Sequence, residues 1–405
     1  MTFQELQVIP SLLTTLTAQG YDTPSPIQAQ AIPVLLQGRD VLASAQTGTG
    51  KTAAFALPII QRLSLQQHHT NQRMIKALIL APTRELAEQI KDSFLTYTGS
   101  INLRTAVIYG GVSQKNQEHV LKRGVDVLIA TPGRLIDLMN QQLIDLRQVK
   151  HFVLDEADLM LDMGFIRDVR RIVKAIPSQR QTMLFSATIP REIMELANEL
   201  LTNPVRIEVT PPEAMIEKIE QSLYFVAKKQ KTSLLRHLLQ NQALQSVLVF
   251  SRTKHGANKL VKELLASGIS ANAIHGNKSQ NQRLLALKDF KSGSSRVLVA
   301  TDIAARGIDI DDLSHVINYD LPDTPETYVH RMGRTGRAGR VGEAYTFCSQ
   351  EESHMLAQIK KLTKMSIPLV ENHPYHELVT PEPVFVPAPL QKRRRNRRPS
   401  ERKYS

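Results

Sequence analysis

The feature of this chain that most restricts its fold is a regular alternation of short apolar runs with longer segments of helical pattern. The runs are rich in Val, Ile and Leu and almost entirely apolar, as expected of strands covered on both faces. Strands that alternate with helices at this spacing form parallel sheets. The expected strands are 41–45, 77–81, 105–109, 125–130, 152–154 and 183–185 in the first half, and 223–226, 247–250, 271–274, 297–300, 316–319 and 344–347 in the second.

The two halves of the chain also repeat one another. Residues 78–84 are echoed 170 residues later by 248–254, and residues 127–131 are echoed at the same offset by 297–301. Apolar strands look alike by chance, but two matches at one offset favour a duplicated domain. Each echo ends in Thr or a basic residue just beyond a strand. That is the carboxyl edge of the sheet, where open α/β folds bind ligands.

The length of 405 residues is too great for one ordinary core and suits two domains with a tail. The segment Thr210-Pro211-Pro212-Glu213 breaks regular structure and marks the boundary. The chain becomes Pro-rich and then strongly basic toward its end, and we expect that tail to be disordered. The expected divisions are a leading segment 1–29, a first domain 30–208, a linker 209–218, a second domain 219–368 and the tail 369–405.

The charge of the chain is concentrated in the tail. The formal net charge is +13, and residues 391–405 contribute +7 of it. Such a tail favours a polyanion, nucleic acid ahead of an anionic membrane surface, with a solubilising role as the alternative. Cys348 is the only cysteine, which fits a reducing compartment, and we expect the cytoplasm. We expect neither a signal peptide nor a membrane span.

A Gly-rich segment after the first expected strand has the pattern of a phosphate-binding loop. Its glycines let backbone N–H groups turn toward one point, and the following helix adds partial positive charge. We expect Lys51 to contact the β- and γ-phosphates of ATP and Thr52 to ligate Mg²⁺. The first position is usually Gly, so a simple Gly-rich turn is the alternative. The segment reads Ala45-Gln46-Thr47-Gly48-Thr49-Gly50-Lys51-Thr52.

Four residues after the fifth expected strand read Asp155-Glu156-Ala157-Asp158. A carboxylate at a strand end beside a phosphate loop can hold Mg²⁺, and we assign this role to Asp155. Glu156 is then placed to orient and deprotonate the attacking water. An acidic start of a helix is the alternative, because acids favour the first turn.

The segments AQTGTGKT at 45–52 and DEAD at 155–158 together resemble the DEAD-box RNA helicases. The family's other motifs follow in order, and the resemblance covers roughly residues 1–370. In that family Ala45 is the expected residue, whereas Ser25 stands where Thr is usual. The resemblance implies two tandem RecA-like domains, and the short basic extension looks like the bacterial RhlE-type branch. The further motifs are residues 20–28, PTRELA at 82–87, Gly110-Gly111, TPGR at 131–134, SAT at 186–188, 249–252, 280–283, ATDIAARGIDI at 300–310 and HRMGRTGR at 330–337.

The resemblance also implies roles outside the phosphate loop. Gln28 would read the adenine edge through its amide, within a segment that includes Tyr21 and Thr23. Phe3 would help enclose the base, although it could equally be a core residue. Arg334 and Arg337 would reach the γ-phosphate as arginine fingers in cis; the alternative for 330–337 is an exposed basic loop. Asp309 would contact the ribose, and Asp158, Ser186, Thr188 and His330 would couple the Mg²⁺ site to RNA.

Candidate RNA contacts lie just beyond strand ends, where hydroxyls, backbone N–H groups and guanidinium groups can follow a sugar–phosphate backbone. The sequence has no RNP-like aromatic run and no zinc spacing, so recognition should not depend on RNA sequence. The choice of RNA over DNA comes from the resemblance alone. The candidates are Thr83, Arg84, Gly110, Gly111, Thr131, Arg134, Arg252, Arg283 and Thr301.

We therefore expect an ATP-dependent RNA helicase that opens short duplexes locally or remodels RNA–protein complexes. Neither domain holds a complete site, so RNA and ATP should promote each other's binding through closure. The alternatives are an ATP-gated RNA clamp or chaperone that binds through its tail and a DNA helicase; the second motif-bearing domain excludes a small P-loop kinase. Ribosomal precursors and RNA-decay machinery are the expected partners, and the core should be monomeric.

Overall fold

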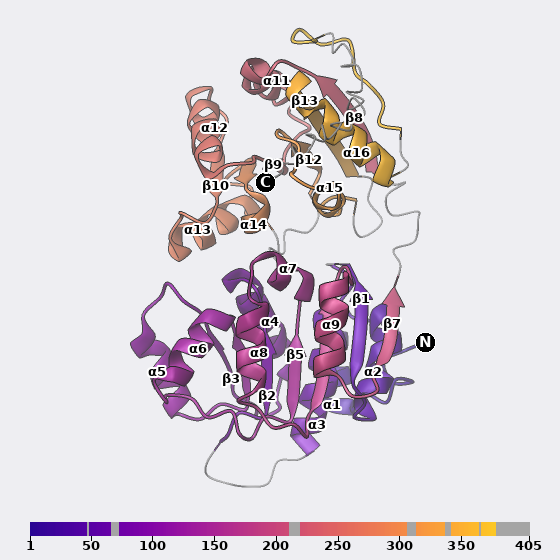
Figure 1. Cartoon of the computed structure of the whole chain (residues 1–405), viewed down its shortest axis with the longest axis vertical. Helices are drawn as coiled ribbons and strands as arrows, with labels where there is room; N and C mark the ends of the chain where they lie inside the picture. The colour runs from indigo at the N-terminus through magenta and orange to yellow at the C-terminus, as the bar shows by residue number, and fades with distance from the viewer. Residues whose placement is uncertain are drawn as a thin grey trace, which may run out of the picture.

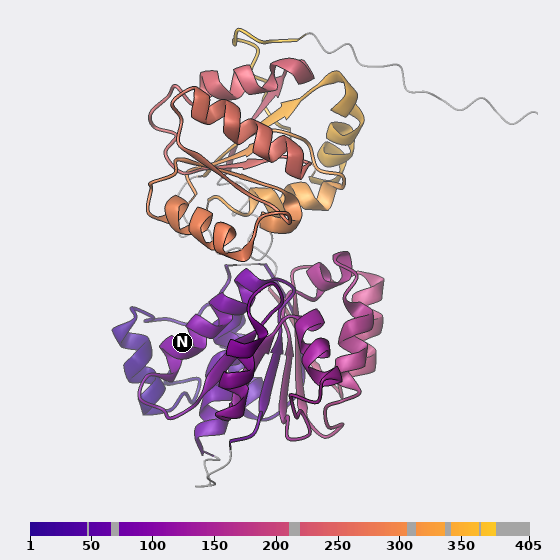
Figure 2. The ribbon, with the colours of Figure 1, turned by 90° about the vertical axis from the view of Figure 1, so that its left-hand side faces the viewer.

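The computed structural model describes residues 1–46, 48–65, 73–209, 219–305, 313–336, 342–363 and 366–377. Within these residues the chain forms two α/β domains that are stacked along the long axis of the molecule (Figures 1 and 2). Each domain is a parallel sheet with helices on both faces. The predicted fold class is therefore confirmed for the described part of the chain.

The first domain contains a seven-stranded sheet in which every pairing is parallel. Its central strands are buried throughout, which explains why their sequences contain few polar residues. In sheet order the strands are β3 (Thr105–Ile108), β4 (Val127–Ala130), β2 (Ala77–Leu80), β5 (His151–Leu154), β6 (Gln181–Ser186), β1 (Val41–Ala45) and β7 (Val205–Val209).

The helices of the first domain form two layers, one on each face of the sheet. One layer packs into a core with Phe55, Phe94 and Phe185, and consists of α1 (Pro10–Ala18), α2 (Pro26–Leu36), α3 (Lys51–Leu65) and α4 (Arg84–Thr98). The other packs around Phe152 and includes α6 (Pro132–Asn140), α7 (Ala157–Asp162), α8 (Ile166–Val173) and α9 (Arg191–Leu200). Helix α5 (Gln114–Lys122) lies beside the edge strand β3.

The second domain repeats the strand order of the first. Its six-stranded parallel sheet runs β10 (Ala271–Ile274), β11 (Val297–Ala300), β9 (Val247–Phe250), β12 (His315–Asn318), β13 (Gly342–Cys348) and β8 (Ile219–Phe225). The sequence echoes fall on β2 and β9 and on β4 and β11, which hold the same places in the two sheets. The topology thus agrees with a duplicated domain.

Helices cover both faces of the second sheet as well. They are α11 (Lys231–Leu238) and α12 (Lys254–Ala266) on one side, α13 (Gln280–Lys291) and α14 (Asp302–Ala305) in a second cluster, and α15 (Pro325–Met332) and α16 (Ser353–Thr363) in a third. Two short 3₁₀ helices, η1 (Lys228–Gln230) and η2 (Gln350–Glu352), lie near the carboxyl ends of β8 and β13.

The structure corrects the predicted start of the disordered tail. Residues 366–377 run beside the edge strand β8 and form a strap: Leu223 donates its N–H to Pro368 and accepts from Val370, and Glu377 donates to Phe225. Val370 and Tyr375 pack against the second-domain core. The Pro-rich composition led to the prediction of disorder here, although the segment contains apolar side chains that pack against the core. The linker 210–218 and residues 378–405 lie outside the described residues.

Across the described ranges of the chain, no helix combines the length and the apolar character that crossing a membrane requires.

Candidate functional site

The phosphate-binding loop connects β1 to α3, as the sequence predicts. Gly48 and Gly50 have φ values of 84° and 91°, a backbone conformation that glycine adopts without strain. A Cβ atom on Gly50 would collide with the Gln28 amide. The loop therefore needs glycine both for its turn and for close packing. Thr47 lies outside the described residues.

The lysine of this loop faces the predicted catalytic acids. Lys51 is buried, and its Nζ lies 2.8 Å from Glu156 Oε1. Burial disfavours the charged ammonium, but Glu156 and Asp155 outweigh this effect and raise the pKa of Lys51. Burial raises the pKa of Asp155 despite the nearby ammonium. A further cation beside Asp155 would favour its ionised form.

Glu156 has a strained backbone. Its φ and ψ of 53° and 55° lie in the left-handed region, which costs a residue with a side chain about 1–2 kcal/mol. The preceding strand β5 and the following helix α7 impose this turn. As a result, the Glu156 carboxylate points to Lys51. Strain of this kind is concentrated at functional sites.

Asp158 joins the acidic segment to the predicted coupling residues. Its Oδ2 accepts hydrogen bonds from the N–H and the hydroxyl of Thr188 at 2.9 and 3.0 Å. Its own N–H donates to the Ser186 hydroxyl at 3.0 Å. The structure therefore brings three of the four predicted coupling residues together, so a shift of the acidic segment must move the end of β6.

Gln28 contacts the phosphate loop rather than standing apart from it. Its Oε1 accepts from the Ser25 N–H at 2.9 Å, and its Nε2 donates to the Gly50 carbonyl at 3.1 Å. The Ser25 hydroxyl donates to the Thr49 carbonyl at 2.7 Å. One amide N–H and one lone pair of Gln28 are left for a base. Any ligand of Gln28 would thus act directly on the loop.

The two aromatic residues predicted to lie near adenine, Phe3 and Tyr21, differ in their exposure to solvent. Phe3 is only 3% exposed and belongs to the first-domain core, so the core position is the one observed. Tyr21 is 40% exposed and makes an edge contact with Tyr97, while Thr23 is exposed beside it. The adenine-enclosing role for Phe3 stays a prediction.

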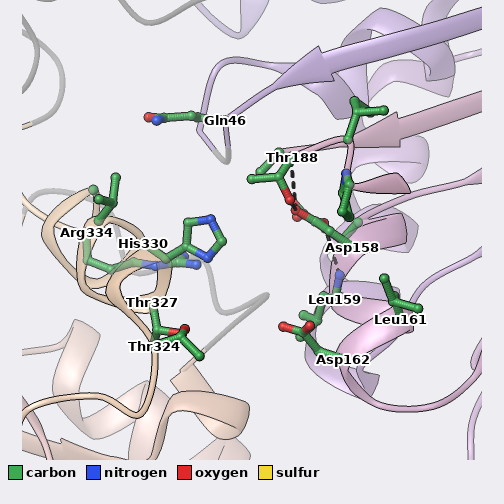
Figure 3. A pocket seen from close by; sticks show the side chains of 16 residues that line it. Gln46, Asp158, Leu159, Leu161, Asp162, Thr188, Thr324, Thr327, His330 and Arg334 are labelled. Carbon is green, nitrogen blue, oxygen red and sulfur yellow. Dashed lines mark hydrogen bonds between the residues drawn. The ribbon is translucent and has the colours of Figure 1, made fainter. Parts of the chain in front are cut away.

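A cavity of about 530 Å³ lies between the two domains. Gln46, Glu156, Asp158 and Thr188 line it from the first domain. Thr324, Thr327, His330 and Arg334 line it from the second. Figure 3 shows His330 and Arg334 on the wall opposite Asp158 and Thr188. The predicted general base Glu156 and the predicted arginine finger Arg334 therefore share one cavity, although they lie far apart in the sequence.

The segment that carries these arginines is not an exposed loop over its described residues. Arg331 is 2% exposed, donates to both carboxylate oxygens of Asp302 at 2.6 and 2.8 Å, and lies over the Phe250 ring. Arg334 is 6% exposed. The alternative of a solvated basic loop is wrong for residues 330–336. Arg337 and Asp309 lie outside the described residues.

The RNA candidates of the first domain occupy one half of the sheet's carboxyl edge. They follow β2, β3 and β4, which are adjacent, whereas the phosphate loop and the acids follow β1 and β5. Two of them are in contact, because a Cβ atom on Gly111 would collide with the Arg84 guanidinium. Thr83 and Thr131 begin α4 and α6, and Arg134 lies in the first turn of α6. The carboxyl edge of the first sheet therefore places the predicted RNA contacts beside the predicted ATP site.

The second domain places its candidates in the same half of its own sheet. Arg252 follows β9, Thr301 follows β11, and Arg283 lies in the first turn of α13, beyond β10. Arg283 is held by the first domain: its Nη2 donates to Glu85 Oε2 at 3.0 Å. Gln280 donates to the other oxygen of Glu85 at 2.9 Å. The sheet edges that carry the predicted RNA contacts of the two domains are thus joined through the buried Glu85 carboxylate.

Comparisons with known proteins agree with this geometry. A family profile described as DEAD/DEAH box helicase matches residues 25–196, and one described as helicase conserved C-terminal domain matches residues 230–339. The DEAD-box ATP-dependent RNA helicase CshA of Bacillus licheniformis is 42% identical over 364 residues, which is 90% of this chain and 74% of that protein. The chain belongs to the DEAD-box family of ATP-dependent RNA helicases. The RNA helicase CrhR of Synechocystis is 43% identical over 90% of this DEAD-box helicase and 73% of its own length.

Solved structures give the same result for the fold. S. cerevisiae Dbp5 bound to RNA and ADP BeF3 is similar with a TM-score of 0.81 and 34% identity, over 91% of this chain and 95% of that one. A DEAD box protein from Methanococcus jannaschii is 40% identical over 91% of this chain and 99% of its own, with a TM-score of 0.52. The assignment to the RhlE-type branch stays a prediction.

Sequence reasoning missed Glu85 and the Asp302–Arg331 pair in this DEAD-box helicase. Glu85 lies in the first turn of α4, directly after the predicted RNA contact Arg84, where an acid usually indicates only a favourable interaction with the helix dipole. An acid directly after Arg84, in a row of otherwise basic or neutral candidates, is the signal that could have identified it. Asp302 and Arg331 could be paired only by bringing two distant motifs together.

Proposed function

We propose that this DEAD-box helicase hydrolyses ATP in the cavity between its domains and uses domain closure to bend and open short RNA duplexes. The observation that carries this proposal is the cavity itself. It has Glu156 and Asp158 on one wall and His330 and Arg334 on the other. Lys51 would bind the β- and γ-phosphates, and Glu156 would orient the attacking water and accept its proton. Arg334, with Arg337, would neutralise the charge that develops on the γ-phosphate.

The residues present fit a magnesium ion. Asp155 offers a buried carboxylate whose pKa is raised by burial, and Thr52 offers a hydroxyl one residue after Lys51. Both are the oxygen ligands that Mg²⁺ prefers. When bound, the ion would neutralise phosphate charge. Gln28 would hold the adenine while its contacts with Ser25 and Gly50 keep the loop in shape.

RNA would follow the adjacent carboxyl edges of the two sheets by phosphate contacts, independently of sequence. The Glu85 contacts with Gln280 and Arg283 support a path that exists only when the domains are together. Each ligand that favours closure must then favour the other. The RNA helicase relatives and the RNA-bound structural neighbour favour this proposal over a DNA helicase or a clamp that acts mainly through its tail. Deleting residues 378–405 should retain ATPase activity and weaken RNA affinity, whereas loss of the ATPase activity would favour the clamp.

The cellular setting is a separate proposal. The lone buried Cys348 supports a reducing cytoplasm. Structured RNA in ribosomal precursors or RNA-decay complexes would suit a monomeric enzyme that binds phosphates without reading sequence.

Glu156→Gln tests the catalytic assignment. Glutamine keeps the size of the side chain but cannot accept the proton. ATP and single-stranded RNA should therefore bind together, while turnover falls by about 10²-fold or more. The measurement is steady-state phosphate release beside equilibrium binding of a labelled oligouridylate with ATP. Near-normal turnover would remove Glu156 from the role of general base.

A further inference from the structure

The second domain brings a buried lysine and two carboxylates together at the carboxyl edge of its sheet. Lys231 is 1% exposed, and its Nζ donates to Glu352 Oε2 and to the Tyr319 carbonyl, both at 2.7 Å. Asp320 Oδ1 lies 3.5 Å from the same nitrogen. A buried ammonium is tolerated only when it is paired and hydrogen-bonded, so Lys231 depends on these contacts in the folded domain.

This cluster occupies the place that the nucleotide site holds in the first domain. Lys51 begins the helix after β1, and Asp155 follows β5. Lys231 begins α11 after β8, and Asp320 lies just beyond β12. Strands β1 and β8, like β5 and β12, stand at the same positions in the two sheet orders. A lysine and an aspartate therefore recur at equivalent places in both domains.

The second domain cannot use this pair for a nucleotide. The segment between β8 and Lys231 reads Val226-Ala227-Lys228-Lys229-Gln230 and has no glycine to form a phosphate cradle. The Glu352 carboxylate instead fills the position beside the ammonium, held by the N–H and hydroxyl of Ser349 at 3.0 and 2.9 Å. Burial opposes the ionisation of Glu352, but Lys231 and Ser349 outweigh it and lower its pKa. The Glu352 carboxylate thus contacts the Lys231 ammonium in place of a bound phosphate.

The same two carboxylates hold Arg252, which follows β9. Asp320 Oδ2 accepts from the Arg252 backbone N–H at 2.9 Å and from the Ser251 hydroxyl at 3.3 Å. Glu352 Oε1 accepts from the guanidinium at 3.3 Å, and the Leu321 carbonyl accepts from it at 3.1 Å. Both the backbone and the side chain of Arg252 are therefore fixed, while 45% of the side chain stays exposed.

We propose that Lys231, Asp320 and Glu352 are positioning residues that hold Arg252 ready to bind an RNA phosphate. Lys231 offsets the charge of the two carboxylates, so that the buried Glu352 and the partly exposed Asp320 can both orient Arg252. A side chain that is already ordered loses less conformational freedom on binding. This inference rests on the proposed function, because Arg252 is one of its RNA contacts.

A double-mutant cycle tests the proposal. Glu352→Gln, Arg252→Met and the double variant are compared with Glu351→Gln, whose adjacent carboxylate is 70% exposed and forms an ion pair with the equally exposed Lys228. The readouts are the oligouridylate concentration that half-stimulates ATP hydrolysis, the rate at saturating oligouridylate, and the melting temperature.

Glu352→Gln should raise the half-stimulating concentration by about five- to tenfold, with a smaller effect on the saturated rate. Arg252→Met should raise it at least as much, and the double variant should match Arg252→Met alone. Glu351→Gln should match the wild type. If Glu352→Gln does not fold, Asp320→Asn takes its place, since this side chain is 23% exposed.

Two results would overturn the inference: effects of Glu352→Gln and Arg252→Met that add in the double variant, or an unchanged half-stimulating concentration in Glu352→Gln while Arg252→Met raises it. An unchanged value in Arg252→Met would instead remove Arg252 from the RNA contacts of the proposed function. The failures of the two proposals are thereby distinguished.

Discussion

Glu85→Gln should shift the two domains toward an open arrangement. Glu85 is 2% exposed and accepts one hydrogen bond from Gln280 and one from Arg283. Glutamine keeps the shape of the side chain but removes the charge that faces the Arg283 guanidinium. The contact joins residues of the first and second domains, so its loss should act on closure rather than on the stability of either domain.

The magnitude follows from the kind of bond that is lost. A hydrogen bond to a charged group contributes about 1.5–3 kcal/mol. The Arg283 side chain is only 14% exposed, so water replaces the lost anion poorly. Because about 1.4 kcal/mol corresponds to tenfold, the closing equilibrium should fall by roughly 10- to 100-fold. ATP and RNA that bind the closed form should both bind more weakly.

Energy transfer between dyes on introduced surface cysteines in α5 and α12 measures this closure directly. The oligouridylate concentration that closes half of the molecules, with a non-hydrolysable ATP analogue present, should rise by at least about tenfold in the variant. Asp92→Asn is the matched control, because this carboxylate lies on the same helix and is 70% exposed. If the midpoints of Glu85→Gln and the wild type coincide, Glu85 does not hold the domains together.

Further predictions concern the second domain and the RNA edge. Lys231→Met should destabilise the second domain by about 3–5 kcal/mol in urea unfolding, because it removes the ammonium that contacts the buried Glu352 carboxylate; a loss below about 1 kcal/mol would contradict this account. The pKa of His373 is lowered by burial and by the neighbouring His376 and His237, so native stability should be complete above the ordinary histidine pKa and decrease as pH falls below it. His373→Phe should therefore narrow the difference in melting temperature between pH 7.5 and pH 5.5, and an unchanged difference would refute the assignment. Gly111→Ala should displace the Arg84 guanidinium and thereby weaken oligouridylate binding severalfold. It should also lower the free energy of unfolding by about 1 kcal/mol, because Gly111 has a φ of 79°. An unchanged oligouridylate affinity would remove Gly111 from the predicted RNA contacts.

Much of the fold follows from the sequence because buried parallel strands are nearly all apolar. Each predicted strand was found within a few residues of its expected bounds. Strand β7 was missed because its residues 205–209 alternate apolar and charged, as suits an edge strand that is half exposed. The strap at 366–377 was missed because its prolines suggested an unfolded chain. In the structure, Val370 and Tyr375 pack against the core of the second domain.

Only the local parts of the candidate site could be predicted from the sequence. Motif spacing predicted the phosphate loop and the acids, since their chemistry depends on a local turn. Contacts such as Glu85 with Arg283, or Lys231 with Glu352, depend on how distant strands are ordered in space. A sequence gives no direct signal for such a pair. For Phe3 the sequence left open a core position and a contact with adenine; the structure places its side chain in the first-domain core, and the contact with adenine stays a prediction.

The measurement that tests the account most directly is the RNA-stimulated ATPase rate of Arg334→Ala at saturating ATP and oligouridylate. Arg334 lines the cavity opposite the acids, and an arginine finger contributes about 10³- to 10⁵-fold to phosphoryl transfer. The account predicts a fall of at least about 10³-fold while ATP remains bound. A rate within about twofold of the wild type would mean that the second domain does not complete the site.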